Sequence, residues 1–443
     1  MEGPEAVFHP ARIICRLGMV LTIMVPETRA VMWGADLSSM ARLEAAGAVW
    51  TRDGQPGDPL QLMAASGWSL LRLRLWHTPA EPWQDLDSTL ALAVRGQAAG
   101  FELLLDLHYS DTWADPGHQD PPAAWQGLAL PALADSVRAY TRRVLERFAD
   151  AGVTPRWVQL GNEIDGGLLW PAGRVDGAWD TPAQWSALRQ LLRAASLGVE
   201  DAFPTGTRPG RLIHLANSGW LAGCSRFLDS LGTAQGPAFE TVGLSYYPWW
   251  HGAPGQLQAT LGGLAQRFGR DLIIVETAYP FTLGWNDNTG NIVGLPGQLL
   301  PDYPATPAGQ QAFLEMLRAR LAAVPGGLGR ALLPWEPAWI SAPLAGSPWE
   351  NLCLFDFTGE ALLALNLPGW LDPAAPRVTA ALTPAHRLRL AWEAVPGAAD
   401  YRVESAPDPA GSWTTVATTS ALEWETEPAA DRTFFRVRSI ALP

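Results

Sequence analysis

The sequence is poor in cysteine. Its 443 residues include three, Cys15, Cys224 and Cys353. Three widely separated thiols supply neither a disulfide framework nor the clustered spacing of a zinc site. We therefore expect inert, buried thiols and a fold that depends on its hydrophobic core.

Charge is also scarce and unbalanced. Charged residues make up 17% of the chain and the formal net charge is −13, whereas an average soluble protein has about 25% charged residues. Because an acidic chain without a basic run is repelled by polyanions, nucleic acid is excluded as a partner and a neutral polymer is not. No stretch approaches twenty consecutive apolar residues, so we expect no membrane span.

Hydrophobic residues, 48% of the chain, and tryptophans, 22 in number, are plentiful. The length and the apolar content predict one large domain with room for a smaller one. A flat indole ring packs well against the apolar face of a sugar, which makes a glycan a candidate ligand. Most individual tryptophans are nevertheless expected to lie in the core.

From residue 31 onward, short apolar runs alternate with helical patterns, which indicates a parallel α/β fold. Eight strand-like runs lie at 31–36, 70–76, 102–108, 157–163, 212–215, 241–247, 272–276 and 330–335. Helices are predicted at 86–99, 130–151, 182–201, 254–268 and 307–323. Eight strands of this kind close a (β/α)8 TIM barrel, predicted for residues 31–370. The rival, a doubly wound sheet, would usually carry a glycine-rich phosphate turn after its first strand, and none is found.

The pattern changes near Pro368. Residues 367–376 form a turn-rich connector, and beyond them the apolar residues alternate with a period of two. Residues 371–443 are therefore predicted to form a small all-β sandwich. It resembles a fibronectin type III module, with Trp392 on the second strand and Tyr401 opening the third.

Residues 1–30 have the features of an imperfect export leader. Arg12 and Arg16 precede an apolar run at 17–25, and Ala30 offers a cleavage site, although Glu27 and Arg29 stand where small neutral residues are preferred. We expect a secreted protein, with Met19 as an alternative start.

Two of the predicted strands end in a glutamate, Glu163 and Glu276, which lie 276 − 163 = 113 residues apart. Barrel enzymes hold their chemistry at the C-terminal ends of the strands, and this separation corresponds to about three strands, so the two should face each other across the mouth. A retaining glycosidase needs this arrangement, with Glu163 as acid/base and Glu276 as nucleophile. Glu163 then needs a raised pKa, and Glu276 must stay ionised.

Other polar residues also end these strands, and a barrel directs them to one mouth. They are Asp36, Arg72, Arg74, Trp76, Asp106, His108, Tyr109, Asp111, Asn162, His214, Asn217, Ser245, Tyr246, Tyr247, Trp335 and Glu336. Because unpaired buried charges are costly, their density at one rim favours a site over a core.

Substrate contacts are predicted from these residues and from nearby tryptophans. They are Asp36, Arg74, His108, Asp111, Trp113, Asn162, His214, Tyr246, Tyr247, Trp250 and Trp335. Arg74 and one of the two tyrosines are expected to keep Glu276 charged, and Asn162 is expected to bind the sugar 2-hydroxyl. A metal site built on His108 and His214 is the alternative, but the tight ligand spacing it needs is missing.

Short motifs in the same stretch add a family resemblance. They are RLRLW (72–76), HYSDTWADP (108–116), GNEI (161–164), LWP (169–171), GLSYYP (243–248), WHG (250–252), ETAYP (276–280) and WEPAW (335–339). In content and order they resemble the arabinogalactan endo-β-1,4-galactanases of glycoside hydrolase family 53. The resemblance implies a (β/α)8 barrel, a retaining mechanism with Glu163 as acid/base and Glu276 as nucleophile, and cleavage within β-1,4-galactan, including type I arabinogalactan.

The same resemblance raises the question of calcium, which some members carry near the loops after strands seven and eight. Asn286, Asp287 and Asn288 are weak candidates, because calcium sites gather more than one carboxylate, and we expect a solvated turn and no required cofactor. Two other functions stay open: a retaining β-glycanase acting on mannan, xylan or glucan, and a non-catalytic glycan-binding surface protein. A monomer is expected.

Overall fold

The structure is a computed structural model that describes residues 12–14, 20–22, 31–232, 234–368, 378–383, 387–392, 398–406, 414–427 and 434–441. The chain divides into two units, and the larger one is Ala30–Pro368. The predicted leader lies outside the described residues, apart from β1 (Arg12–Ile14) and β2 (Val20–Thr22), which pair antiparallel.

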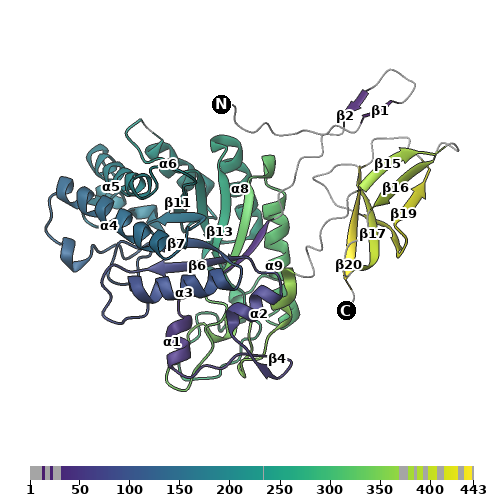
Figure 1. Cartoon of the computed structure of the whole chain (residues 1–443), viewed down its shortest axis with the longest axis horizontal. Helices are drawn as coiled ribbons and strands as arrows, with labels where there is room; N and C mark the ends of the chain where they lie inside the picture. Colours follow the sequence, from purple (N-terminus) through teal and green to yellow (C-terminus); the bar gives the residue numbers. More distant parts are fainter. Residues whose placement is uncertain are drawn as a thin grey trace. The chain divides into compact units, whose positions relative to one another are not determined.

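Eight parallel strands close a barrel in the larger unit (Figure 1). They are β3 (Met32–Asp36), β6 (Leu70–Leu75), β7 (Glu102–Leu107), β8 (Trp157–Leu160), β11 (Gly210–Leu215), β12 (Thr241–Tyr246), β13 (Asp271–Thr277) and β14 (Gly329–Pro334). Each strand pairs with the next along the chain, and β14 returns to β3. All eight predicted strands are confirmed, and their order is that of a (β/α)8 barrel.

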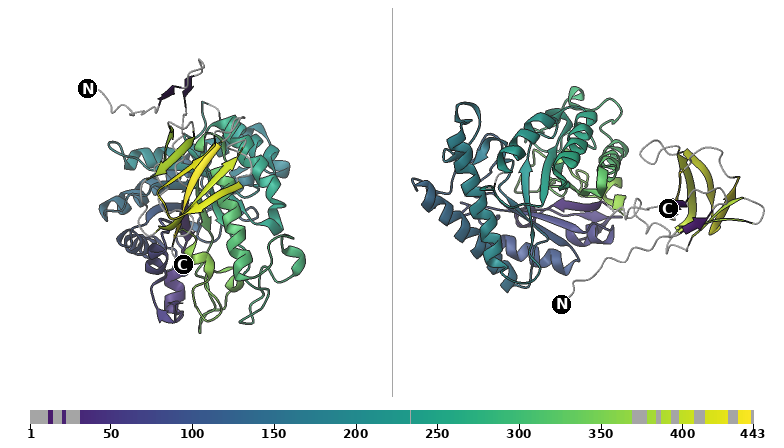
Figure 2. Two further views of the ribbon diagram at one scale, coloured as in Figure 1. Left: turned by 90° about the vertical axis from the view of Figure 1, so that its right-hand side faces the viewer. Right: turned by 90° about the horizontal axis from the view of Figure 1, so that it is seen from above.

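Helices surround these strands (Figure 2). They are α1 (Met40–Ala45), α2 (Pro59–Ala65), α3 (Leu86–Ala98), α4 (Leu130–Asp150), α5 (Pro182–Ala202), α6 (Leu221–Leu231), α7 (Pro248–His251), α8 (Pro254–Phe268) and α9 (Pro307–Ala322). The five predicted helices are confirmed to within one residue at each end. Among the described residues, no helix is both long and apolar enough to cross a bilayer.

Two short antiparallel hairpins complete the larger unit. They are β4 (Thr51–Arg52) with β5 (Gln55–Pro56), and β9 (Gly167–Leu168) with β10 (Gly173–Arg174). The second hairpin belongs to the long connection between β8 and α5, which borders the site described below.

The interior of the barrel changes from apolar to polar along the strands. Leu70 and Leu104 belong to the buried apolar cluster, and two residues further along the same strands come Arg72 and Asp106, also buried. Side chains two residues apart lie on the same face of a strand. The alternation therefore carries charged groups inward, and they form a polar floor beneath the mouth.

An irregularity in β13 brings Glu276 to this mouth. Ile274 pairs with Leu244, but the next pair joins Glu276 to Ser245, so Val275 is an extra residue in the ladder. Val275 belongs to the interior apolar cluster, and strict alternation would turn the following side chain outward. A bulge re-aims the residues after it, and here it keeps Glu276 on the inner side.

The C-terminal part is all β. One antiparallel sheet holds β15 (Val378–Leu382), β16 (Leu388–Trp392) and β19 (Glu423–Thr426), and the other holds β17 (Ala398–Ala406), β18 (Thr414–Thr419) and β20 (Phe434–Ala441). Residues of both sheets share one buried cluster, in which the rings of Trp392 on β16 and Tyr401 on β17 lie 5.5 Å apart. The predicted all-β character is confirmed.

Candidate active site

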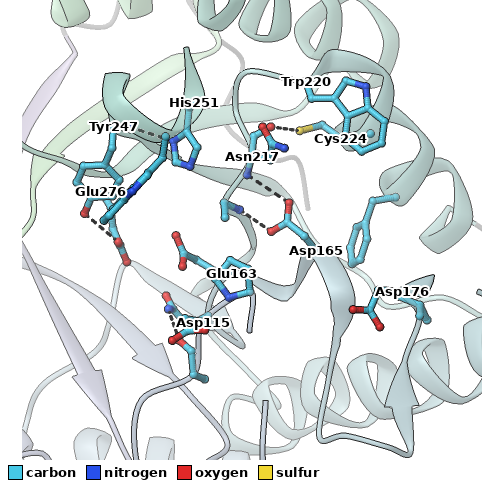
Figure 3. A pocket seen from close by; sticks show the side chains of 18 of the residues that line it. Asp115, Glu163, Asp165, Asp176, Asn217, Trp220, Cys224, Tyr247, His251 and Glu276 are labelled. Atoms are coloured by element: carbon cyan, nitrogen blue, oxygen red, sulfur yellow. Dashed lines mark hydrogen bonds between the residues drawn. The ribbon is translucent and has the colours of Figure 1, made fainter. Parts of the chain in front are cut away.

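A cleft of about 810 Å³ opens where the barrel strands end, and both Glu163 and Glu276 line it (Figure 3). Glu163 follows β8, and Glu276 lies next to the last residue of β13. Their carboxyl groups point into the same cavity. The structure thus brings the two glutamates together at the end of the barrel where enzymes of this fold hold their chemistry.

Glu276 is held by a cation and a phenol. Its Oε1 lies 2.9 Å from Arg72 Nη1, and its Oε2 accepts a hydrogen bond of 3.1 Å from the Tyr247 hydroxyl. Burial raises the pKa of Tyr247 well above its ordinary value, so the hydroxyl remains a donor. Burial also raises the pKa of Glu276, and the Arg72 guanidinium opposes that rise.

Arg72 is the centre of the polar floor. Its Nη1 also binds Asp36 Oδ2 over 2.7 Å, and its Nη2 donates to Asp106 Oδ2 and Asn162 Oδ1, both over 2.9 Å. Burial acts to lower the pKa of Arg72, but the carboxylates of Asp106, Glu276 and Asp36 raise it above its ordinary value. The guanidinium is therefore charged, and its ion pairs join β6 to β3, β7 and β13.

The prediction that Arg74 partners Glu276 is wrong. Arg74 Nη1 instead donates to Glu336 Oε1 over 2.6 Å, and its Nη2 donates to Ser39 Oγ over 2.8 Å. Arg72 and Arg74 lie two residues apart on the inner face of β6, so periodicity alone cannot tell which of them reaches Glu276.

Glu163, in contrast, is held by neutral groups. Its Oε1 lies 2.6 Å from Ser245 Oγ, and its backbone N–H points at His214 Nδ1 over 3.3 Å. The residue has a left-handed backbone, with φ 49° and ψ 54°, which costs a non-glycine residue about 1–2 kcal/mol. Strain of this kind persists where the surrounding structure fixes a functional side chain.

His214 and Ser245 extend this contact into a chain of hydrogen bonds. His214 Nε2 lies 2.9 Å from Ser245 Oγ, and Nδ1 lies 2.9 Å from Asn162 Oδ1. Burial lowers the pKa of His214 well below its ordinary value, so the ring is neutral and carries one proton. When Glu163 is ionised, Ser245 donates to it and accepts from Nε2. When Glu163 is protonated on Oε1, its hydroxyl can donate to Ser245 Oγ, which has two acceptor lone pairs.

These neighbours decide which carboxyl keeps its proton. Arg72 favours the charged form of Glu276, whereas burial and the proximity of Glu276 raise the pKa of Glu163 well above its ordinary value. Since the two groups titrate as a pair, the first proton to leave comes from Glu276. Above the pKa of Glu276, which burial raises to about 7, the site therefore holds one acid and one carboxylate.

Aromatic residues form much of the cleft wall. The rings of Trp113 and Trp335 lie 5.9 Å apart, the Arg74 guanidinium lies 4.3 Å from the Trp113 ring, and Trp250 on α7 is 58% exposed. The sequence predicts these three tryptophans. The wall also includes Trp185, Trp220 and Trp349, which the prediction misses. Trp220 follows the end of β11 by five residues, so a search of each loop after a strand finds it.

The other predicted contacts separate into three groups. His108, Asn162, Arg74 and Tyr247 line the cleft with the tryptophans. Asp36 and His214 are fully buried beneath it, in the hydrogen-bond networks of Arg72 and Ser245.

Asp111 and Tyr246 do not reach the cleft. The Asp111 carboxylate accepts from the backbone N–H groups of Thr78 and Ala123, which makes it a loop brace. Tyr246 ends β12 one residue before Tyr247, so its side chain lies on the opposite face, where its hydroxyl donates to the carbonyl of Gly252. The prediction took every polar residue at a strand end as directed to the mouth. It did not consider on which face of the strand each side chain lies, so it could not find these two contacts.

The loop with Asn286, Asp287 and Asn288 does not fit calcium. Asp287 Oδ1 accepts from the N–H of Thr289 over 2.5 Å, and Oδ2 accepts from Ser341 Oγ and from the N–H of Ser347. A second carboxylate at this loop, Glu350, accepts from the N–H of Asn286 and contacts Ser341 Oγ. Calcium needs six to eight oxygen ligands, and both carboxylates are already engaged by hydroxyl and N–H donors. Over the whole described part of the chain, no three His, Cys, Asp or Glu residues gather as a metal site would require.

Two glutamates with unlike neighbours, Glu276 buried and Glu163 half-buried, in an aromatic cleft at the mouth of a (β/α)8 barrel, define the class of glycoside hydrolases. Comparison with known proteins gives the family. Residues 32–367 match the model of glycosyl hydrolase family 53, so the chain belongs to that family.

Similar proteins agree over the same region. An uncharacterized protein of Niallia circulans is 39% identical over 347 residues, which is 77% of this chain and 94% of that protein. A probable arabinogalactan endo-beta-1,4-galactanase A of Neosartorya fischeri is 34% identical, over 76% of this chain and 92% of its own. The solved family 53 catalytic domain of Ignisphaera aggregans is 31% identical, with a TM-score of 0.69 over 79% of this chain and 98% of that one.

Proposed function

We propose that this chain cleaves β-1,4-galactosidic bonds within galactan and type I arabinogalactan. The observation that carries the proposal is the unlike environment of two glutamates that face one cavity, Glu276 beside a cation and Glu163 beside a neutral hydroxyl. Membership of family 53 and a relative named for this activity supply the substrate class.

In the first step, the Glu276 carboxylate attacks the anomeric carbon of the bound sugar. The bond from that carbon to the glycosidic oxygen breaks, and Glu163 donates its proton to the departing oxygen. The product is a glycosyl ester on Glu276 and a free chain end on the leaving side. Arg72 and Tyr247 hold the attacking carboxylate in place, so little rearrangement precedes the attack.

In the second step, a water molecule attacks the same carbon from the side that the leaving chain has vacated. Glu163, now a carboxylate, takes the water proton, and the ester bond to Glu276 breaks. Ser245 can donate to Glu163 in this ionised state, and it can accept from Glu163 in the protonated state. The hydroxyl thus suits both halves of the cycle.

Asn162 and the aromatic wall complete the proposed substrate site. The Asn162 oxygen is occupied by Arg72 and one amide hydrogen is used by the carbonyl of Ala114, over 2.7 Å. The second amide hydrogen remains for the sugar 2-hydroxyl. Trp113, Trp250 and Trp335 supply flat apolar surfaces along a polymer.

Two further parts of the proposal concern the C-terminal sheets and the location of the protein. Two antiparallel sheets around Trp392 and Tyr401 support a fibronectin type III-like module, which would space or display the barrel. A polymeric plant polysaccharide as substrate supports action outside the cell.

The experiment is a timed digest of linear β-1,4-galactan, with mannan, xylan and glucan in parallel. We expect galactan alone to be cut, at internal bonds, with products that first appear in the β configuration. Glu163→Gln and Glu276→Gln should each lower turnover by orders of magnitude while galactan still binds. Binding without release of reducing ends by the wild-type protein would replace the proposal with a glycan-binding function.

A further inference from the structure

One exposed tryptophan in the cleft has no part in the contacts described so far. Trp220 precedes α6, lines the same cleft as the two glutamates, and is 59% exposed. A large aromatic side chain in a concave site is costly to leave in water, and such a surface commonly marks a ligand contact. Trp220 lies on the connection that follows β11, whereas Trp113 follows β7 and Trp335 follows β14.

The ring of Trp220 is held in position from below. A Cβ placed on Gly223 would meet ring carbon Cε3 at 2.2 Å, which is closer than real Cβ atoms come to other atoms. The glycine therefore lets the ring rest directly on the first turn of α6. One ring face is covered by the helix, and the large exposed fraction leaves the other open.

The loop that carries Trp220 is also tied to the catalytic strand. Asp165, two residues after Glu163, accepts from the N–H groups of Ala216 and Asn217 over 2.6 and 3.2 Å. On the other side of the loop, Gly219 packs so closely on the carbonyl of His251 that an added Cβ would lie 2.1 Å from that oxygen. Pre-organised contacts of this kind lower the entropy cost of binding.

The position of Trp220 relative to the glutamates indicates which sugar it would meet. In Figure 3, Glu276 and Tyr247 lie on one side of Glu163, and Asp165 and Trp220 lie on the other. Under the proposed function, Glu276 attacks the anomeric carbon while Glu163 protonates the oxygen that joins this carbon to the next sugar. The part of the cleft beyond Glu163, which is lined by Trp220, Asp165, Asp176 and Asp180 and is termed the arm, therefore faces the leaving chain.

We propose that Trp220 is the stacking platform for a sugar on the leaving-group side of the bond that is cut. This inference rests on the proposed function and adds the place at which the departing half of the polymer is held. The apolar C–H face of a pyranose covers the open face of the indole, and its hydroxyls point to the polar groups of the arm.

The charged residues of the arm favour a neutral sugar over an acidic one. Asp165, Asp176 and Asp180 line the arm. Its arginine, Arg226, is paired with Asp180, and Asp176 is paired with Arg174 from outside the cleft lining. Among the described lining residues, no arginine is left unpaired for a sugar carboxylate, so a uronic acid would meet net negative charge. A galactose unit fits, and a galacturonate unit does not.

The test compares two substrates that differ on the leaving side alone. Linear β-1,4-galactan places sugars in the arm, whereas β-1,4-galactobiosyl fluoride releases fluoride and places none. We expect Trp220→Ala to lower the ratio of kcat/KM for galactan to kcat/KM for the fluoride about tenfold. Trp179→Ala is the matched control, because Trp179 is 40% exposed and lies outside the cleft lining. It should leave the ratio unchanged.

A second variant guards against a folding defect. Gly223→Ala favours the helix, but its Cβ must push the Trp220 ring aside. The ratio should fall here too, with no loss of thermal stability. An unchanged ratio in both variants would overturn the assignment of Trp220. A wild-type protein that cleaves neither substrate would overturn the proposed function and this inference with it.

Discussion

The two sides of the cleft use the same residue type in opposite settings. On one side, Glu276 contacts the guanidinium of Arg72 and the phenol of Tyr247. On the other, Glu163 contacts the hydroxyl of Ser245, with a neutral His214 behind it. Burial raises the pKa of both carboxyls. The difference between them comes from the neighbours, which separate an anion from an acid within one cavity.

Loss of either glutamate gives the strongest contrast between the two sides. We expect Glu276→Ala to lower kcat by roughly five orders of magnitude on both galactan and a galactobiosyl fluoride, because no nucleophile remains. Glu163→Ala should lower kcat/KM for galactan about 10²- to 10⁴-fold and kcat/KM for the fluoride far less, because fluoride leaves without a proton and kcat/KM does not include the later hydrolysis of the glycosyl ester. Steady-state kinetics of both variants on both substrates measure these losses. Equal losses on the fluoride would show that the two roles are not divided as the contacts indicate.

Removal of the cation tests the anionic side through stability. Arg72→Met leaves Asp36, Asp106 and Glu276 without their shared buried partner, so we expect the free energy of unfolding to fall by about 3–5 kcal/mol. Arg95→Met is the control, since Arg95 is 40% exposed and binds Glu44 at the surface. It should cost no more than about 1 kcal/mol. Denaturant unfolding measures the free energy of unfolding of both variants. Similar losses would mean that burial does not determine how much Arg72 stabilises the fold.

The phenol beside Glu276 is predicted to have a smaller effect. Tyr247→Phe removes one hydrogen bond to the charged carboxylate, which should lower kcat/KM about tenfold or more. Because that bond favours the ionised form, its loss raises the pKa of Glu276. The acid limb of the pH profile should therefore move to higher pH. A limb that stays in place or moves to lower pH would contradict this assignment.

The smallest change is expected on the neutral side. Ser245→Ala removes the donor to Glu163, and a hydrogen bond to a charged acceptor is stronger than one to a neutral acceptor. The pKa of Glu163 should rise, and the basic limb of kcat/KM against pH should move to higher pH while the acid limb stays. A shift of the acid limb instead would place Ser245 in the Glu276 network.

The barrel and its two glutamates are visible in the sequence because both follow local rules. Buried parallel strands appear as apolar runs, and Glu163 and Glu276 stand where two of these runs stop. Long helices that open with proline, such as α5 and α8, are found to within one residue. α6 is missed because its N-cap is Trp220, which makes no capping bond with its side chain.

The sequence does not show which of several similar side chains contacts a given residue of the site. Arg72 and Arg74 share one face of β6, and contact with Glu276 depends on a bulge in a strand five positions later around the barrel. Tyr246 and Tyr247 are neighbours of one type, and their facing depends on where β12 ends. Such choices are made by packing across the barrel, which no local window of sequence contains.

Arg72 couples the stability of this protein to the ionisation of Glu276. The same guanidinium that keeps Glu276 charged also joins Asp36 on β3 to Asp106 on β7. An engineer who wishes to move the working pH of the enzyme therefore cannot adjust that residue without weakening the scaffold. The surroundings of Glu163, built from uncharged groups, are the side on which adaptation can proceed at low structural risk.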